Sequence, residues 1–307
     1  MTPYFANLNY RSGRSDGALT TVPRVTIQPL KENDEAETIR FLQERALHNA
    51  VMSGFIRDHG MESALNRGTF YGAREENKRL QGVALIGHAT FMDARNDAVI
   101  NEFAQLAQAF PRIHMVLGEN KPIEQFWRSY ADGGQPLRRR CHEMLLEVNE
   151  VAPHLAPVPE LQPATLANLH HIAAVQAALA YQESGTNPLT LDPSGFLLRC
   201  RQRIERERVW AWIRDGQLIF KADLITETPE VIYLEGIYVN PNDRNRGLGA
   251  RCTTQLARQL LNRARSIVVL VNETRADALR FFQGVGFVAR GVYQSLFLEI
   301  RNSGDEQ

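Results

Sequence analysis

The most constraining feature of this sequence is an apolar strand that runs directly into a glycine-containing loop and an amphipathic helix. The apolar run covers residues 231–239, and the loop after it contains the pattern Arg244-x-x-Gly247-x-Gly249. A helical pattern then extends from about residue 248 to residue 265. Such a turn collects free backbone N–H groups at the positive end of a helix dipole, where a phosphate is stabilised.

The residue types in this loop favour an anionic ligand. Gly247 and Gly249 carry no Cβ, so we expect a bulky anion to lie directly against the backbone. Arg244 and Arg246 can add charge-assisted hydrogen bonds to phosphate oxygens. The pattern matches neither the dinucleotide-binding glycine fingerprint nor the Walker loop with its Lys-Ser/Thr pair.

The order of elements around the loop resembles the GNAT superfamily of acetyl-CoA-dependent N-acetyltransferases. In that family, an Arg/Gln-x-x-Gly-x-Gly/Ala loop follows the fourth strand. Here the helix after the loop leads to a strand at residues 266–272, a short helix ending near Gly286-Phe287, and a last strand at residues 291–300. The resemblance covers about residues 160–300 and implies an α/β fold with a mixed sheet of the α+β kind.

The chain divides into two halves that look like a divergent repeat. Three prolines mark a linker at residues 151–160, which separates a first domain at residues 25–150 from a catalytic domain at residues 161–301. Residues 1–24 are polar and are expected to form a flexible arm. The first half has no Arg-x-x-Gly-x-Gly pattern, so we predict two tandem GNAT-like domains, the first degenerate. The alternative is an unrelated α/β domain in front.

Short segments of the second half resemble a narrower group. The runs Phe220–Asp223, Leu234–Val239 and Leu270–Asn272 are similar to bacterial two-domain GNAT proteins that carry a domain of unknown function in front of the acetyltransferase. The resemblance names no substrate.

Composition excludes several partners. Lys and Arg total 35, as do Asp and Glu, so the formal charge is zero and neither a nucleic-acid nor an anionic membrane partner is expected. The three cysteines are scattered and odd in number, without metal-ligand spacing, so we expect no metal and a reducing, cytoplasmic location. The N-terminus lacks the apolar segment of a signal peptide.

The resemblance implies acetyl-CoA as acyl donor and coenzyme A as product. Backbone groups of Ile237, Tyr238 and Val239 would bind the thioester carbonyl and the pantetheine arm, which Asn272 could also bond. Family enzymes often have a tyrosine five residues before the Phe of the Gly-Phe pair, where it protonates the leaving thiolate. Phe282 occupies that position here, and Tyr293 on the last strand is the candidate replacement. The pyrophosphate would rest on Arg244, Asn245, Arg246, Gly247, Leu248, Gly249 and Ala250.

Glu235 is the best candidate for a general base. A primary amine is protonated at neutral pH and must lose a proton before it attacks a thioester. Strand alternation places Glu235 on the same face as Ile237 and Val239, and apolar surroundings should raise its pKa. The alternative is a solvated or ion-paired glutamate at the strand edge.

These observations predict an N-acetyltransferase that transfers an acetyl group to a primary amine by direct attack. The acceptor would be a small-molecule amine or a protein amino group. The alternative is a non-catalytic acyl-CoA-binding regulatory protein, which the loss of the usual tyrosine favours. The identity of the acceptor and the oligomeric state stay open, since fold alone does not give substrate.

Overall fold

The protein is described here from a computed structural model that covers residues 25–151 and 156–299. The predicted arm at residues 1–24, part of the predicted linker and the end of the predicted last strand lie outside these described residues. The division into domains at residues 25–150 and 161–301 stays a prediction.

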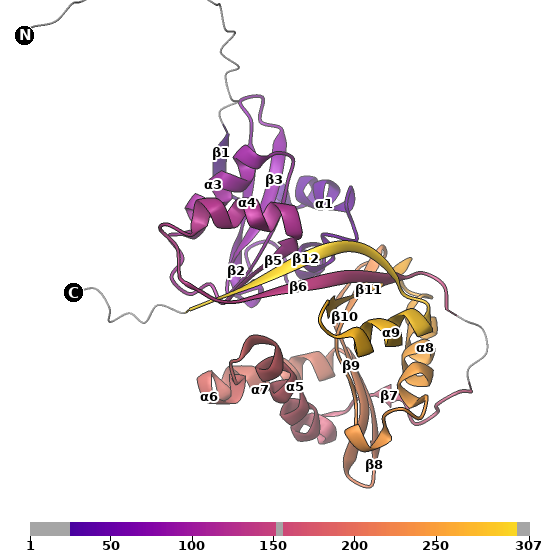
Figure 1. The fold of residues 1–307 in the computed structure, drawn as a ribbon. Helices are drawn as coiled ribbons and strands as arrows, with labels where there is room; N and C mark the ends of the chain where they lie inside the picture. Colours follow the sequence, from indigo (N-terminus) through magenta and orange to yellow (C-terminus); the bar gives the residue numbers. More distant parts are fainter. Residues whose placement is uncertain (1–24, 152–155, 300–307) are drawn as a thin grey trace, which may run out of the picture.

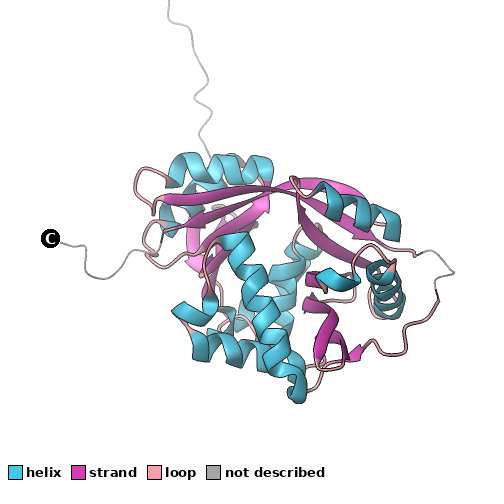
Figure 2. Ribbon diagram, turned by 60° about the horizontal axis from the view of Figure 1, so that its bottom comes forward, coloured by secondary structure: helices cyan, strands magenta, loops and turns pink. Residues whose placement is uncertain are grey.

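A twelve-stranded mixed sheet with helices on both sides forms the frame of the molecule (Figures 1 and 2). The first half contributes β1 (Thr26–Pro29), α1 (Glu35–Gln43), α2 (Ala50–His59), β2 (Gly68–Arg74), β3 (Leu80–Gly87), β4 (Ala89–Ala94), α3 (Asp97–Ala107), β5 (Met115–Glu119), α4 (Asn120–Tyr130) and β6 (Leu137–Val148). The second half contributes β7 (Gln162–Pro163), α5 (Leu169–Ser184), α6 (Pro188–Leu191), α7 (Pro193–Glu205), β8 (Val209–Arg214), β9 (Gln217–Glu227), β10 (Val231–Val239), α8 (Leu248–Leu260), β11 (Ser266–Asn272), α9 (Ala276–Val285) and β12 (Val288–Leu298).

The two halves exchange their last strands. The order across the sheet is β1-β2-β3-β4-β5-β12-β6-β11-β10-β9-β8-β7, so β12 pairs with β5 of the first half and β6 pairs with β11 of the second. The two exchanged strands also pair with each other, antiparallel, from Val288 opposite Glu147 to Leu298 opposite Leu137. Figure 1 shows them as two long strands that run together between the halves. Each half therefore depends on the other for an inner strand of its sheet.

The repeat predicted from sequence is present in the fold. Strands β2, β3 and β4 form an antiparallel meander, as do β8, β9 and β10. In each half the meander's last strand makes a short parallel pair, β4 with β5 and β10 with β11. The intervening helix is α3 in the first half and α8 in the second. This architecture confirms the mixed α/β prediction and the tandem GNAT-like arrangement.

Local sequence signals account for several elements. Asp215 and Gly216 both have positive φ angles, 52° and 72°, as a tight two-residue hairpin between β8 and β9 requires. The apolar stripe of α8 is buried against the sheet through Cys252, Leu256 and Leu260.

Other elements differ from the prediction. In the first half, α1 ends at Gln43, and a separate helix, α2, begins at Ala50. In the second half, α5 begins at Leu169, after a 3-10 turn. The helices α6 and α7 were not predicted, although each begins with proline after an Asn or Asp cap. No helix within the described residues is long and apolar enough to cross a membrane.

Candidate active site

The parallel strands β10 and β11 separate partway along their length. They pair from Val231 opposite Ser266 to Leu234 opposite Val269, and no further. Beyond that point β11 continues beside β6 as far as Asn272, whereas β10 bends at an irregularity between Glu235 and Tyr238. The fork leaves backbone groups of both strands facing a gap instead of each other.

A β-bulge at Gly236 causes the bend and changes which side chains share a face. Glu235 pairs with Asp223 and Tyr238 pairs with Lys221, so β10 carries one extra residue. Gly236 has a φ of +57°, in the left-handed region. The prediction that Glu235 shares a face with Ile237 and Val239 is therefore wrong, because the extra residue reverses the alternation.

The two faces have different surroundings. Ile237 and Val239 pack against the core beneath α8, whereas Tyr238 packs on the opposite side with residues of α5. Glu235 lies on this second side, where Tyr233 donates a hydrogen bond of 2.7 Å from its hydroxyl to Glu235 Oε1. The bulge thus places the carboxylate on the face of the sheet that α5 covers.

The loop before α8 has the backbone shape that an anion site needs. Asn245 and Gly247 have φ angles of +60° and +72°, and the first turn of α8 has no side-chain cap. Its N–H groups at Leu248, Gly249 and Ala250 lie at the positive end of the helix dipole. Arg244, Asn245 and Arg246 are exposed around this turn, and Arg244 Nε also donates to the Val239 carbonyl at 3.1 Å.

The two glycines of this loop have different tasks. A Cβ on Gly247 would meet open space, so this residue provides the turn and leaves room for a ligand. A Cβ on Gly249 would lie 2.9 Å from Val239 Cγ2 and 3.1 Å from Phe281 Cε2. Gly249 is buried, and its lack of a Cβ lets the helix approach β10 closely; contact between its backbone and a ligand stays a prediction.

A cavity of about 660 Å³ extends from the fork between β10 and β11 to the first half of the chain. Ile237, Asn272 and Phe282 line it at the fork. Helices α5 to α7 form one wall, and strands β5, β6 and β12 contribute to another. Both halves therefore build the cavity, which the sequence did not indicate.

Three carboxyl groups meet inside this cavity. Glu143 comes from β6, Glu183 from α5 and Glu235 from β10, and all three line the cavity. Burial, together with repulsion from the other carboxylates of the cluster, raises the pKa of Glu143 to about 7 and that of Glu183 to about 8. Ser295 on β12 donates to Glu143 Oε2 at 2.9 Å.

Glu235 has the properties expected of a base. The exposed surface of Glu235 faces the cavity. Protein groups therefore replace much of the water around its carboxylate. Burial raises its pKa above the ordinary glutamate value, although the Tyr233 hydroxyl and the charge of Arg203 act in the opposite direction. Tyr233 is buried, and its own pKa is raised well above that of a free tyrosine.

Lys221 fixes the bulge from beneath. Its side chain is fully buried, with Nζ 2.8 Å from Gln176 Oε1, 3.0 Å from the Gly236 carbonyl and 2.9 Å from Asp223 Oδ1. Arg203 lies 2.9 Å from the second oxygen of Asp223. Lys221 therefore neither reaches solvent nor contacts Glu235. It joins α5 to the carbonyl group at the fork.

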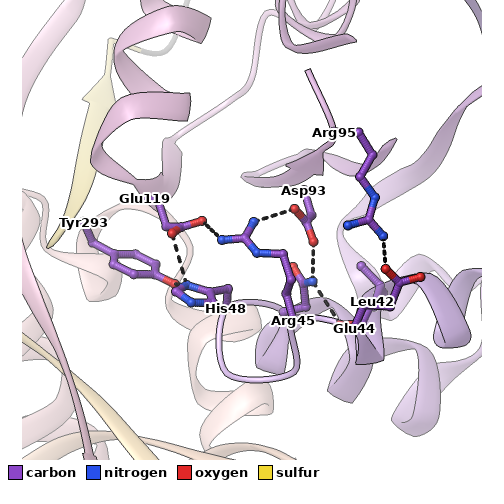
Figure 3. Close-up of polar contacts among 9 residues, drawn as sticks. Leu42, Glu44, Arg45, His48, Asp93, Arg95, Glu119 and Tyr293 are labelled. Atoms are coloured by element: carbon purple, nitrogen blue, oxygen red, sulfur yellow. Dashed lines mark hydrogen bonds and ion pairs between the residues drawn. The ribbon is translucent and has the colours of Figure 1, made fainter. Parts of the chain in front are cut away.

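The structure does not bring Tyr293 together with Glu235. The Tyr293 hydroxyl lies 2.8 Å from His48 Nδ1, and the side chain is absent from the lining of the large cavity (Figure 3). Burial raises the pKa of Tyr293 far above that of a free tyrosine. Phe282 and Asn272, in contrast, both line the cavity at the fork, and Asn272 Oδ1 accepts from the backbone and hydroxyl of Thr274.

The corresponding fork in the first half is filled by ion pairs. Strands β4 and β5 pair only through Ala89 and Thr90. Beyond them, Arg45 lies 2.7 Å from Asp93 on β4 and also pairs with Glu119 at the end of β5 (Figure 3). The positively charged side chain joins the two strands where β10 and β11 leave a gap.

The helix start after this fork is also closed. The Asn96 side chain accepts a hydrogen bond from the Val99 N–H of α3, and Asp97 adds a negative charge to the first turn. Neither group favours a phosphate. The degenerate character predicted for the first half thus has a structural basis at both positions.

Several residues of the cavity were missed by sequence reasoning. Glu143 and Glu183 belong to a strand and a helix that meet β10 only through the exchanged sheet and its helical cover. Tyr233 was visible two residues before Glu235, and period-two alternation places both on one face. The other cavity residues from the first half are Arg67, His88, His114, Met115, Leu117 and Arg139.

Comparison with known proteins agrees with this geometry. A model of the acetyltransferase (GNAT) family matches residues 177–287. No curated protein is significantly similar to the chain in sequence.

Solved structures extend the likeness to most of the chain. A GNAT-family acetyltransferase from Colwellia psychrerythraea is 11% identical with a TM-score of 0.55, covering 89% of this chain and 100% of its own. A GCN5-related N-acetyltransferase from Sphaerobacter thermophilus is 12% identical with a TM-score of 0.55, covering 91% and 96%. A tandem GNAT protein from the clavulanic acid biosynthesis pathway is 13% identical with a TM-score of 0.52, covering 91% and 100%. At these sequence identities, the similarity to the solved structures establishes the fold alone.

Proposed function

Because the chain belongs to the GNAT superfamily of acetyltransferases through residues 177–287, we propose that it transfers an acetyl group from acetyl-CoA to a primary amine. The observation that carries the proposal is the open fork between β10 and β11, which leads from the uncapped start of α8 into a cavity that holds Glu235. A donor at the fork and an acceptor in the cavity would meet at the carboxylate.

The coenzyme would bind along the loop and the fork. The N–H groups of residues 246–250 and the side chains of Arg244 and Arg246 would hold the pyrophosphate. The pantetheine arm would lie in the gap beside Ile237, Tyr238 and Val239, with a backbone N–H of β10 donating to the thioester carbonyl. The side chains of Asn272 and Phe282 would border the arm on the β11 side.

Glu235 would accept the proton of the attacking ammonium group. The free amine then forms a C–N bond with the thioester carbon, and the C–S bond breaks to release coenzyme A. The nitrogen loses its second proton as the amide forms, and the leaving thiolate takes up one proton, so that coenzyme A leaves as the thiol. The raised pKa of Glu235 suits this task, because a base nearer to the amine in pKa accepts the proton more readily. Tyr293 is bonded elsewhere, so the proton for the thiolate would come through the cavity.

The enzyme is tested by supplying acetyl-CoA with a panel of amines and measuring the release of free thiol. We expect turnover by the wild type and a loss of about 10²–10⁴-fold in kcat for Glu235→Gln. Glu76→Gln, an exposed glutamate of the first half, is the matched control and should keep full activity.

A second candidate function is non-catalytic binding of an acyl-CoA, as in a regulator. The observation in its favour is Phe282, which lines the cavity where many relatives carry a proton-donating tyrosine. It predicts a raised melting temperature with acetyl-CoA and no thiol release with any amine. Turnover that depends on Glu235 would exclude it.

A cytoplasmic location is part of the proposal, supported by three cysteines that are all unpaired and buried.

A further inference from the structure

The end of the cavity away from the fork is positively charged. Arg67 precedes β2 with a φ of 54°, and Arg199 projects from α7. Arg199 pairs with Asp192, whereas the Arg67 guanidinium has no carboxylate within ion-pair distance among the described residues. Burial, with repulsion from Arg199, lowers the pKa of Arg67 to about 10. Arg67 keeps exposed surface and lines the cavity, so an anion that enters the cavity can form charge-assisted hydrogen bonds with its guanidinium.

Two histidines lie beside this arginine in uncharged form. His88 and His114 stack with ring centroids 5.0 Å apart and planes 8° from parallel. Burial and the charge of Arg67 lower the pKa of His88 to about 3, and burial also lowers the pKa of His114. A neutral imidazole still offers one N–H donor, so the histidine pair adds hydrogen-bond donors beside the positive charge of Arg67.

The positive and negative ends of the cavity are well separated. Ser295, which bonds Glu143, pairs with Leu117 on β5, and His114 precedes Leu117 by three residues. At a rise of roughly 3.3 Å per residue, the histidine pair lies about 10 Å from the glutamate cluster along the strand. Arg139 also lines the cavity and lies near Glu183, but its guanidinium donates to the Gln182 carbonyl, and the three carboxyl groups outnumber it. Glu143, Glu183 and Glu235 thus attract a cation at one end of the cavity while Arg67 attracts an anion at the other.

We propose that the acceptor is a zwitterion in which a primary ammonium group and an anionic group stand about 10 Å apart. The ammonium group binds at the three glutamates beside the fork, and the anionic group, a carboxylate or a phosphate, binds at Arg67 and the histidine pair. The inference rests on the proposed function. If it holds, residues of the first half select the acceptor. A plain polyamine fits less well, because its second cation would face Arg67.

The test compares acceptors of matched length in the thiol-release assay. The probes are ω-amino carboxylates from glycine to aminodecanoate, aminoalkyl phosphates of the same lengths, and n-alkylamines and diamines without an anion. We expect kcat/KM to rise with length to an optimum at the carboxylate or phosphate whose charges span the cavity. At that length it should exceed the value for the alkylamine about tenfold or more.

Variants separate the two ends of the cavity. Arg67→Met should lower the ratio of kcat/KM for the optimal zwitterion to kcat/KM for the alkylamine about tenfold, through KM for the zwitterion, and Arg67→Lys should restore part of this ratio. Glu183→Gln should weaken both kinds of acceptor. Arg112→Met, at an exposed position outside the cavity, is the control. If Arg67→Met does not fold, Arg199→Met tests the same end.

The outcomes distinguish this inference from the proposed function. Thiol release with alkylamines and zwitterions alike, unchanged in Arg67→Met, would overturn the zwitterion and leave the acetyltransferase intact. Preference for diamines would do the same. No thiol release with any probe would instead refute the acetyltransferase itself. In a direct binding test with coenzyme A present throughout, the optimal zwitterion should raise the melting temperature of wild type further and should not raise that of Arg67→Met.

Discussion

Replacing Lys221 with methionine tests whether the bulge at the fork depends on a buried ion pair. Methionine approximates the length of lysine but removes the charge and all three contacts of Nζ, with Gln176, the Gly236 carbonyl and Asp223. Asp223 is only 1% exposed, so its carboxylate cannot regain water. Arg203 keeps one of its oxygens paired.

The expected loss of stability is large for a single substitution. Removing one partner of a buried ion pair costs about 3–5 kcal/mol, because the remaining charge stays buried. For a chain of 307 residues this corresponds to a fall in melting temperature of roughly 5–8 °C. Adding Asp223→Asn to Lys221→Met should restore part of the loss, since the buried charge is then removed.

Thermal and urea unfolding measure the change, and steady-state kinetics with acetyl-CoA follow its effect on the fork. Lys121→Met, at an exposed position of α4, is the control and should unfold like the wild type. Because the Gly236 carbonyl loses its anchor, we also expect a higher KM for acetyl-CoA. A Lys221→Met protein that melts within about 1 °C of wild type would refute the reasoning.

Three further predictions concern the pH dependence, the loop and the exchanged strands. The pKa of Glu143 rises from 4.5 to about 7 on folding, so the folded state binds more protons in this range; its contribution to stability is complete below about pH 4.5 and is lost as the pH rises through about 7. Urea unfolding at about pH 5 and about pH 8 should show this fall, and Glu143→Gln should make it smaller, while Glu183, whose pKa is raised to about 8, keeps contributing to it. Gly249→Val should cost about 1–3 kcal/mol and weaken coenzyme binding, whereas Gly247→Ala, measured beside it, should cost about 1–2 kcal/mol through its positive φ alone. Cutting an engineered protease site between residues 151 and 156 should leave the fragments associated on size exclusion, because β6 and β12 each complete the other half's sheet; separation without denaturant would contradict the exchange.

The loop and helix that we propose for the coenzyme could be located from the sequence because their parts are local. The apolar strand, the loop from Arg244 to Ala250 and the helix after it are consecutive, and their chemistry follows from backbone rules. Glu235 was identified for the same reason, as a lone carboxylate in an apolar strand. Its orientation was not, since one extra residue at Gly236 reverses the alternation and no sequence signal other than the glycine marks it.

The acceptor side could not be predicted, because its residues are distant in sequence. Glu143 belongs to strand β6, which by its place in the chain should complete the sheet of the first half. Glu183 lies on helix α5, whose first turn contains no acidic residue. Only the exchange of β6 and β12 brings these residues and Ser295 together. Tyr293 is the opposite case. Its position in the last strand suggested a proton donor to the leaving thiolate, but its hydroxyl forms a hydrogen bond with His48 of the other half.

The sequence by itself determined the strands and helices from β10 to β12, the glycine turn before α8 and the absence of such a turn from the first half, because each depends on neighbouring residues and their backbone preferences. Tertiary structure alone decided which half each inner strand completes, which face carries Glu235, and how a cavity with opposite charges at its ends forms between the halves. Strand pairing is set by the burial of whole faces across the sheet, and that energy is shared among residues far apart along the chain.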